Sequence, residues 1–330
     1  MSEQILTAQQ MRTAEAELIA AGTSVEALMR LAGQGAAGFV WRMAGPGRMV
    51  TVLTGAGNNG GDGWVLAEAI RQRGGRVQVV MAAEPRTPAA ISARAAYGGA
   101  VVAGAGASGA VLVDCLFGTG LTRPLEAGDL ALLQGLAARH GACVAVDLPS
   151  GIEADSGAAL NEGLPDYQLT IALGAWKFAH YLMPAAARMG GLRLVEIGVA
   201  PVAGAAQVLA RPGLAAPAAD AHKYRRGLVG VVLGAMPGAA VLAGRAAQGA
   251  GAGYVKLLGD GPLAVAVPAD LVVAPRDLAE PRLGALLVGP GLGRDGEARA
   301  RLAEALGAGH RLVLDADALH LLRRGDALPE

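Results

Sequence analysis

An apolar run that ends in a glycine-rich turn constrains this chain most. The run VTVLT stops at Gly55 and predicts a buried parallel strand, and WVLAE, after GAGNNGGDG, begins a helical pattern. Such a turn aims backbone N–H groups and the positive end of the helix dipole at one point, and glycine lets a ligand approach the backbone. The two asparagines and the aspartate add three side-chain oxygens. The segment predicts an anion-binding site, with an unliganded turn as the alternative.

Strands and helices alternate through the first half, which predicts a doubly wound parallel α/β sheet. Two helices within residues 6–43, separated at Gly22, come first. The expected strands are residues 50–53, 76–81, 111–116, 143–148, 169–173 and 192–197, and the expected helices are 63–72, 87–97 and 129–139. Ligands of such sheets bind at the carboxyl ends of strands. Polar clusters at residues 55–62, 114–124 and 147–151 all follow strand ends, so we expect them to form one site.

The alternation begins again after an Ala/Pro/Gly-rich stretch. Strands are expected at 228–233, 286–288 and 312–314, with a helix ending near residue 251. The predicted organisation is a first domain at 1–205, a linker at 206–220 and a second α/β domain at 221–330.

Charge and cysteine usage exclude several classes of protein. The 28 basic and 28 acidic residues balance, so no net charge attracts nucleic acid or an anionic membrane. The uncharged stretch at 228–244 contains a proline and glycines and is too short to span a membrane. Cys115 and Cys143 lie in strand-like runs and are expected to be buried apolar groups in a reducing cytoplasm. The N-terminus lacks the layout of a signal peptide.

Asp147 ends a strand beside Pro149 and has two interpretations. It is a general acid/base whose pKa partial burial raises toward neutrality, or it caps the following turn. Asp114 has the same two interpretations. With Asn59 and Ser150 it forms a set of oxygen donors that suits an alkali or alkaline-earth cation rather than zinc.

The sequence assigns no catalytic role to three other residues. Lys177 follows an apolar strand and is expected to be a solvated loop residue. His180 and His222 have no partner at the spacing of a metal site.

The motifs together resemble a known family. In order, TGAGNNGGDGWV, VDCLFGTGLTRP, VAVDLPSGI and LTIALGAWKFAHYLMPAAARMGGLRLVEIG resemble signature segments of the NAD(P)H-hydrate epimerases, over roughly residues 5–205. The later segments HKYRRGLVGVVLGAMPGAAVLAGRAAQGAGAGYVKL, LLVGPGLGR and LVLDADALHLL resemble the NAD(P)H-hydrate dehydratase domain, a ribokinase-like fold. The chain therefore resembles the bifunctional nicotinamide-nucleotide repair enzymes.

The resemblance implies a substrate, cofactors and residue roles. Hydrated NADH and NADPH would be epimerised at the C6 hydroxyl, with Asp147 shuttling protons, and a potassium ion would be held by Asn59, Asp114 and Ser150. Dehydration in the second domain would use ADP or ATP. The implied substrate-binding residues, with Arg123 near the phosphates, are Asn58, Asn59, Gly60, Gly61, Asp62, Gly118, Thr119, Gly120, Leu121, Thr122, Arg123, Pro124 and Asp147, and in the second half Ala239, Gly291 and Asp315.

The sequence also departs from the family pattern. Arg30 and Glu15 replace the usual Glu and Asp, and we expect both to lie outside the site cluster. Phe178-Ala179 replaces the usual Pro-Gly after Lys177, which puts a substrate role for that loop in doubt. The family continues past DADAL to a GTGD segment with the phosphate loop and catalytic aspartate. The chain ends before such a segment, so we expect an inactive dehydratase domain.

Three other functions fit parts of the sequence. A non-catalytic nucleotide- or protein-binding module of the same fold is the main alternative, and the intact set of Asn59, Asp114, Asp147 and Ser150 argues against it. A Rossmann dehydrogenase needs an acidic residue about 20 positions after the glycine motif, and Glu84 lies too far on. A sugar kinase would need the missing catalytic loop. A homo-oligomer is expected, although no motif specifies its subunit number.

Overall fold

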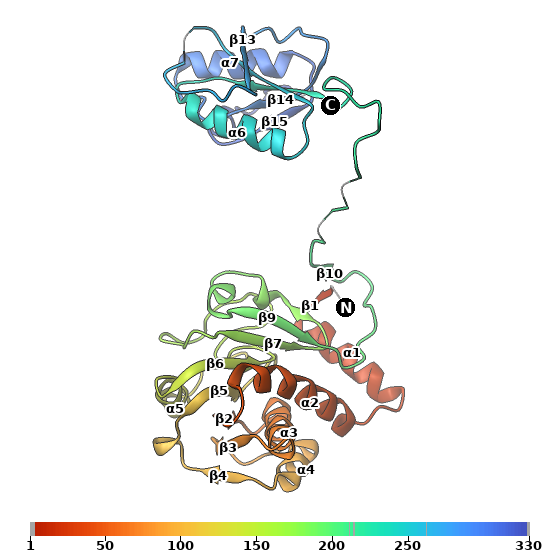
Figure 1. The fold of residues 1–330 in the computed structure, drawn as a ribbon, viewed down its shortest axis with the longest axis vertical. Coiled ribbons are helices and arrows are strands. Elements are labelled where there is room, and N and C mark those ends of the chain that lie inside the picture. The colour runs from red at the N-terminus through yellow and green to blue at the C-terminus, as the bar shows by residue number, and fades with distance from the viewer. Residues whose placement is uncertain (1–3, 211, 214, 262, 329–330) are drawn as a thin grey trace. The chain divides into compact units, whose positions relative to one another are not determined.

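The computed structural model describes residues 4–210, 212–213, 215–261 and 263–328. The chain divides into two compact units, residues 1–211 and 212–330, and Figure 1 draws the fold of each.

The first unit is built on seven parallel strands. They are β2 (Met49–Thr54), β3 (Arg76–Met81), β4 (Ala100–Val102), β5 (Gly109–Cys115), β6 (His140–Val146), β7 (Leu169–Leu173) and β9 (Gly191–Val195). Their order is β4-β3-β2-β5-β6-β7-β9, and every neighbouring pair is parallel. The predicted doubly wound parallel sheet is confirmed. The strand order reverses between β2 and β5, the switch point at which ligands bind in such sheets.

Helices cover both faces of this sheet. They are α1 (Ala8–Ala20), α2 (Val25–Ala44), α3 (Asn58–Gln72), α4 (Pro88–Ala96) and α5 (Ala127–Ala137), with 3₁₀ turns at Gly104–Gly106, Phe178–His180 and Ala185–Arg188. Side chains alternate along each strand, so Val52 packs in the cluster with α2, α3 and α4, whereas Leu53 packs in the cluster with α5. Thr7, Ser24 and Thr87 cap the helices that follow them.

Helix α3 begins earlier than predicted. It starts at Asn58 rather than at residue 63, so the Asn-Asn-Gly-Gly-Asp sequence forms its first turn instead of a loop. Periodicity could not reveal this start, because glycine and asparagine carry no apolar pattern.

A small sheet, absent from the sequence prediction, joins distant parts of the first unit. Its strands are β10 (Ala206–Gln207), β1 (Gln4–Leu6) and β8 (Trp176–Lys177). Leu6 pairs with Lys177 in parallel register, and Gln4 pairs with Gln207 in antiparallel register. Ala206 and Gln207 thus belong to a strand, although they lie within the expected linker.

The second unit contains a five-stranded parallel sheet. Its order is β13 (Val272–Ala274), β12 (Tyr254–Leu258), β11 (Leu228–Val232), β14 (Leu283–Val288) and β15 (Leu312–Leu314). Its helices are α6 (Pro237–Gly249), α7 (Gly296–Gly307) and α8 (Asp317–Leu321). In the part of the chain that the structure describes, no helix combines the length and apolarity of a membrane span.

Candidate active site

A cleft of about 390 Å³ opens where the strand order of the first unit reverses. The turns after β2, β5 and β6 line it together with residues of α1 and β8. The structure therefore brings the three polar clusters to one place. Of the residues expected to bind substrate, those lining the cleft are Asn58, Asn59, Asp62, Gly118, Thr119, Gly120, Leu121 and Asp147. Gly60 and Gly61 lie in the same helical turn, and Thr122, Arg123 and Pro124 follow the β5 turn without lining the cleft.

Two glycines let the turns of the cleft approach one another. A Cβ atom on Gly60 would lie 2.0 Å from the carbonyl oxygen of Gly55, a contact that the backbone cannot accommodate. A Cβ atom on Gly118 would lie 2.7 Å from Oδ2 of Asp147 and 3.3 Å from Cγ of Asn59. The missing side chain at 118 therefore keeps the β5 turn close to Asp147.

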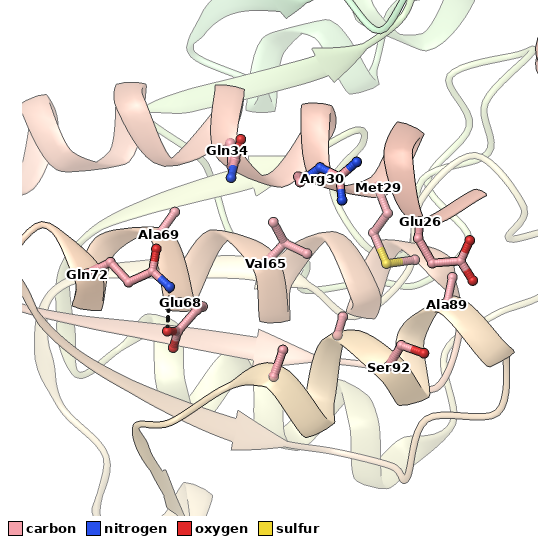
Figure 2. A pocket seen from close by; sticks show the side chains of 12 residues that line it. Glu26, Met29, Arg30, Gln34, Val65, Glu68, Ala69, Gln72, Ala89 and Ser92 are labelled. Atoms are coloured by element: carbon pink, nitrogen blue, oxygen red, sulfur yellow. Dashed lines mark hydrogen bonds between the residues drawn. The ribbon is translucent and has the colours of Figure 1, made fainter. Parts of the chain in front are cut away.

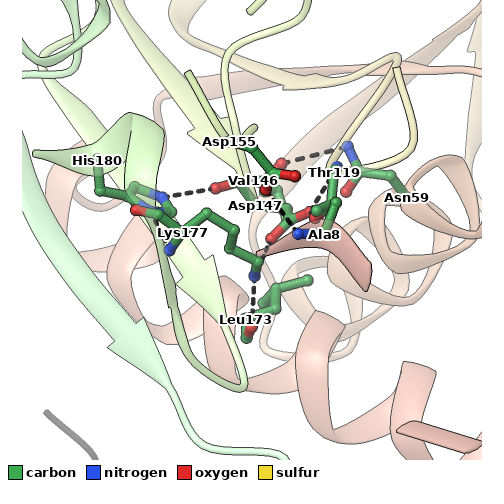
Figure 3. Close-up of polar contacts among 9 residues, drawn as sticks. All are labelled: Ala8, Asn59, Thr119, Val146, Asp147, Asp155, Leu173, Lys177 and His180. Atoms are coloured by element: carbon green, nitrogen blue, oxygen red, sulfur yellow. Dashed lines mark hydrogen bonds and ion pairs between the residues drawn. The ribbon is translucent and has the colours of Figure 1, made fainter. Parts of the chain in front are cut away.

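Asp147 lies at the centre of a network of charge-assisted hydrogen bonds (Figure 3). It is 7% exposed and has a φ of 69°, a value that few residues other than glycine adopt. Its Oδ2 accepts from the backbone N–H of Thr119 at 2.8 Å and from the Thr119 hydroxyl. Its Oδ1 lies 2.5 Å from Nζ of Lys177, which also donates to the carbonyl oxygen of Leu173 at 2.7 Å.

The expectation of a solvated Lys177 is wrong. Its side chain is 1% exposed and its ammonium group is paired with Asp147. β8 is a two-residue strand that ends at this lysine, and it is held by pairing with β1. This pairing joins residues distant in sequence, so local pattern could not show it. A lysine four residues after the end of an apolar strand was the only signal in the sequence for a buried ion pair.

The pKa of Asp147 shifts in the direction opposite to the prediction. Burial raises the pKa of this carboxyl, but the charge of Lys177 and the hydrogen bonds from Lys177 and Thr119 outweigh burial and hold the pKa below its usual value. Asp147 is therefore a carboxylate at neutral pH, ready to accept a proton.

His180, to which the sequence assigned no role, supports the backbone of Asp147. Its Nδ1 accepts from the backbone N–H of Lys177 at 2.9 Å. The proton is therefore assigned to Nε2, which lies 2.9 Å from the carbonyl oxygen of Asp147 and donates to it. Burial, together with the nearby charge of Lys177, lowers the pKa of His180 to about 4, so the ring is neutral at pH 7.

Two further carboxyl groups line the cleft, Asp62 on α3 and Glu15 on α1. Burial, with an added contribution from the negative charge of Asp147, raises the pKa of both, and that of Asp62 lies well above its usual value. The expectation that Glu15 lies outside the cluster is wrong. Glu15 follows the buried Met11 by four residues, so helical spacing placed it near the inner face of α1.

The expected cation ligands lie at the same strand ends. Asp114 is fully buried, and its carboxylate accepts from Leu116 N–H, from the hydroxyl and N–H of Ser150 and, at 2.6 Å, from the Tyr167 hydroxyl. Burial raises the pKa of Asp114, and these donors offset part of that effect. A carboxylate has about four acceptor positions, so this carboxylate is already saturated.

Asn59 provides the observation that fits a cation. Its amide nitrogen donates to the carbonyl oxygen of Val146 at 3.2 Å, which orients the group, and its buried Oδ1 has no hydrogen-bond partner among the described residues. Ser150 Oγ accepts from Phe117 N–H and donates to Asp114, so the hydroxyl retains an acceptor position. The residues fit a cation that Asn59 and Ser150 contact and that Asp114 balances in charge. In the described ranges, no cluster of three His, Cys, Asp or Glu side chains could hold a metal ion.

Of the three residues singled out in the second unit, Gly291 and Asp315 follow strand ends, and Ala239 lies in the first turn of α6. Gly291 follows β14 with a φ of 69°, and a Cβ atom there would lie 3.0 Å from the Cβ atom of Ala239. Asp315 follows β15, where its backbone N–H donates to the carbonyl oxygen of Val288 at 3.1 Å. Its side chain is exposed.

A second hollow in the first unit, of about 240 Å³, lies between α2, α3 and α4 (Figure 2). Arg30 of α2, Val65 of α3 and Ser92 of α4 line it. Arg30 thus lies away from the strand-end cleft, as expected.

Comparisons with known proteins cover both units. Residues 25–179 match the family described as YjeF-related protein N-terminus, and residues 229–329 match the family described as NAD(P)H-hydrate dehydratase. Two proteins named bifunctional NAD(P)H-hydrate repair enzyme Nnr are similar along most of the chain. The one from Mycobacterium tuberculosis is 34% identical over 94% of this chain and 67% of its own length, and the one from Gloeobacter violaceus is 37% identical over 96% and 70%.

The first unit also has single-function relatives. A protein of Achromobacter xylosoxidans named NAD(P)H-hydrate epimerase is 40% identical over 46% of this chain and 74% of its own length. Among solved structures, the yeast protein ynu0 (YNL200c) covers 56% of this chain and 84% of that chain at 21% identity, with a TM-score of 0.47.

Proposed function

The chain belongs to the family of bifunctional NAD(P)H-hydrate repair enzymes, and we propose from this that the strand-end cleft of its first unit interconverts the S and R forms of hydrated NADH and NADPH. The second unit is a NAD(P)H-hydrate dehydratase domain. The observation that supports the proposed site best is Asp147, a buried carboxylate at the switch point.

Asp147 acts as the base of the reaction. Inversion at C6 requires that a proton be taken from an oxygen at that carbon, and a positioned carboxylate typically accelerates such a transfer by about 10²- to 10⁴-fold. Lys177 and Thr119 hold the carboxylate ionised and fix its orientation, and His180 holds its backbone. The site therefore has its base in place before substrate binds.

The first turn of α3 suits the phosphates of the nucleotide. Gly57 precedes the helix and provides no side-chain cap, so the first backbone N–H groups of α3 are left for a ligand. Asn58 and Gly60 act here through their backbone N–H groups, whereas the N–H of Gly61 already donates to the carbonyl oxygen of Gly57 at 3.1 Å. Thr122, Arg123 and Pro124 follow the β5 turn, and the exposed Arg123 guanidinium can reach a phosphate on the outside of the cleft.

Two cofactors complete the proposal. Asn59 and Ser150 would hold a potassium ion, balanced by the charge of Asp114, and the ion would supply a fixed positive charge beside the nucleotide. In the second unit, Ala239, Gly291 and Asp315 would lie near the hydrated nucleotide, and ADP or ATP would be the co-substrate of dehydration by a complete dehydratase domain.

The proposal also covers the cellular compartment and the oligomeric state of the protein. Both described cysteines are free and buried, which suits a reducing cytoplasm. We also propose a homo-oligomer. A non-catalytic binding module is not favoured, because such a module has no need of a buried carboxylate held by a buried lysine.

The substitution Asp147→Asn tests the proposed function. The asparagine side chain retains the shape of the carboxylate and loses the proton acceptor, so epimerisation should fall by roughly 10²-fold or more. Chromatographic separation of the two epimers over time measures the rate. Glu162→Gln, at an exposed position outside the cleft, is the matched control. An Asp147→Asn protein as fast as the unmodified chain would rule out this role.

A further inference from the structure

Asp62 is a buried carboxyl group that the proposed mechanism has not yet used. It lies in the first turn of α3, is 8% exposed and lines the cleft. Its side chain makes no hydrogen bond or ion pair with any of the residues that the structure describes. Its carboxyl oxygens are not among the fully enclosed polar atoms without a partner, so they face the open space of the cleft, where a ligand can bind them.

The charges around Asp62 differ from those around Asp147. Asp147 and Glu15 face it from the end of β6 and from α1, and Cys115 lies beside it on β5. Lys177 opposes their effect, but its ammonium group bonds directly to Asp147. Burial first, and then the negative charges of Asp147 and Glu15, raise the pKa of Asp62 well above its usual value.

One cleft therefore holds two carboxyl groups whose pKa values shift in opposite directions. Lys177 and Thr119 donate to Asp147 and hold its pKa below the usual value, whereas burial and like charge raise the pKa of Asp62, whose side chain has no hydrogen-bond partner among the described residues. Pairs of titratable groups whose surroundings separate their pKa values are how active sites obtain an acid and a base at the same pH.

We propose that Asp62 is the second catalytic residue of the cleft and donates the proton with which the C6 hydroxyl leaves. This inference rests on the proposed epimerase function and adds an acid to its base.

The step balances in atoms and charge. The hydroxyl takes the proton of Asp62 and leaves as water when the C6–O bond breaks, and the lone pair of the neighbouring ring nitrogen forms a C=N double bond that carries the positive charge. A water molecule then adds to C6 from the other face. Its oxygen forms the new C6–O bond, its proton passes to the Asp147 carboxylate, and the C=N electron pair returns to nitrogen. Asp62 ends ionised and Asp147 protonated.

Reaction of the opposite epimer returns both carboxyl groups to their starting protonation states. Its hydroxyl leaves with the proton now on Asp147, and the incoming water gives its proton to Asp62. Exchange of both carboxyls with solvent restores the same starting state. Both directions of the reaction therefore use the same two residues with exchanged roles.

The pH dependence of kcat separates this role from a structural one. In the unmodified chain kcat should fall as pH rises through the pKa of Asp62, because the acid is then lost. Asp62→Asn should lower kcat by about 10²-fold or more, change KM by much less, and remove that alkaline limb. Glu15→Gln removes a negative charge that raises the pKa of Asp62, so it should move the alkaline limb to lower pH while Asp62 stays in place.

The outcomes separate this inference from the proposed function. An unmodified chain that does not epimerise hydrated NADH contradicts the function itself. An active chain whose Asp62→Asn variant keeps its kcat, or keeps the alkaline limb, overturns only the role of Asp62. If Asp62→Asn fails to fold, Glu15→Gln provides the test instead. An alkaline limb at the same pH in Glu15→Gln as in the unmodified chain would also overturn the role of Asp62. Glu162→Gln should leave both kcat and the limb unchanged.

Discussion

The pKa values of two aspartates in one cleft shift in opposite directions because their neighbours differ. Asp147 faces an ammonium group and two donors from Thr119, whereas Asp62 faces two carboxylates and no donor among the described residues. Both are buried, so burial alone cannot account for the difference. Hydrogen bonds to the charged form and opposite charge favour ionisation, and like charge disfavours it. Removing Lys177 would leave a buried carboxylate uncompensated, a change that typically costs about 3–5 kcal/mol.

His180 should make the first unit sensitive to mild acid. Its pKa is about 4 in the folded protein and 6.5 when exposed, so below pH 6.5 the unfolded chain binds the proton first. The stabilisation is fully present above pH 6.5 and is lost as pH falls toward 4, by up to about 3 kcal/mol. Urea unfolding at pH 7.5 and pH 5, followed by tryptophan fluorescence, measures the loss, because all three tryptophans lie in the first unit.

The comparison with His180→Gln isolates this residue from the carboxyls that titrate nearby. Glutamine is neutral at every pH, so the variant should lose less stability than the unmodified chain between pH 7.5 and 5. Equal losses of stability in the two proteins would contradict the assignment of this pH dependence to His180.

At the scale of elements, the ends of β2, β5 and β6 define the cleft, and sequence pattern located all three. Each strand is an apolar run that stops at a polar residue, and parallel strands bring such stops to one edge of a sheet. In the first unit, the strands that sequence pattern missed were the short ones. β1, β4 and β8 have only two or three residues each, too few for a period to appear. Lys177 and His180 were misread for this reason, since β8 has its place only through pairing with β1.

The meeting of these strand ends also predicts an effect of the cation on binding. Replacing potassium by tetramethylammonium, which is too large to sit among close oxygen atoms, should weaken the binding of hydrated NADH by about fivefold or more. Titration calorimetry in matched chloride salts measures this effect. The Asn59→Ala protein should bind equally in both salts. Equal binding by the unmodified chain would mean that Asp114, Ser150 and Asn59 form only a hydrogen-bonded turn.

At the scale of the whole molecule, the two units are joined by an exposed segment that lacks regular secondary structure among its described residues. Residues 208–227 contain no helix or strand in the described part of the chain, and most of them are exposed. Trypsin should therefore cut first after Lys223, Arg225 or Arg226. The larger fragment should retain epimerase activity, because every described residue of the cleft precedes residue 178. Mass spectrometry and the epimer assay on the same samples check this, and activity lost in step with that cut would contradict it.

The pairing of β1 with β8 fixes the order in which the active site can be completed during synthesis. Leu6 leaves the ribosome about 170 residues before its partner Lys177, and Gln4 about 200 residues before Gln207. Synthesis proceeds at roughly 5–20 residues per second, so β8 is made about 10 to 35 s after β1. Asp147 is made within that interval and has no buried cation until Lys177 follows. The nascent chain thus acquires its cleft early and its ionised base last.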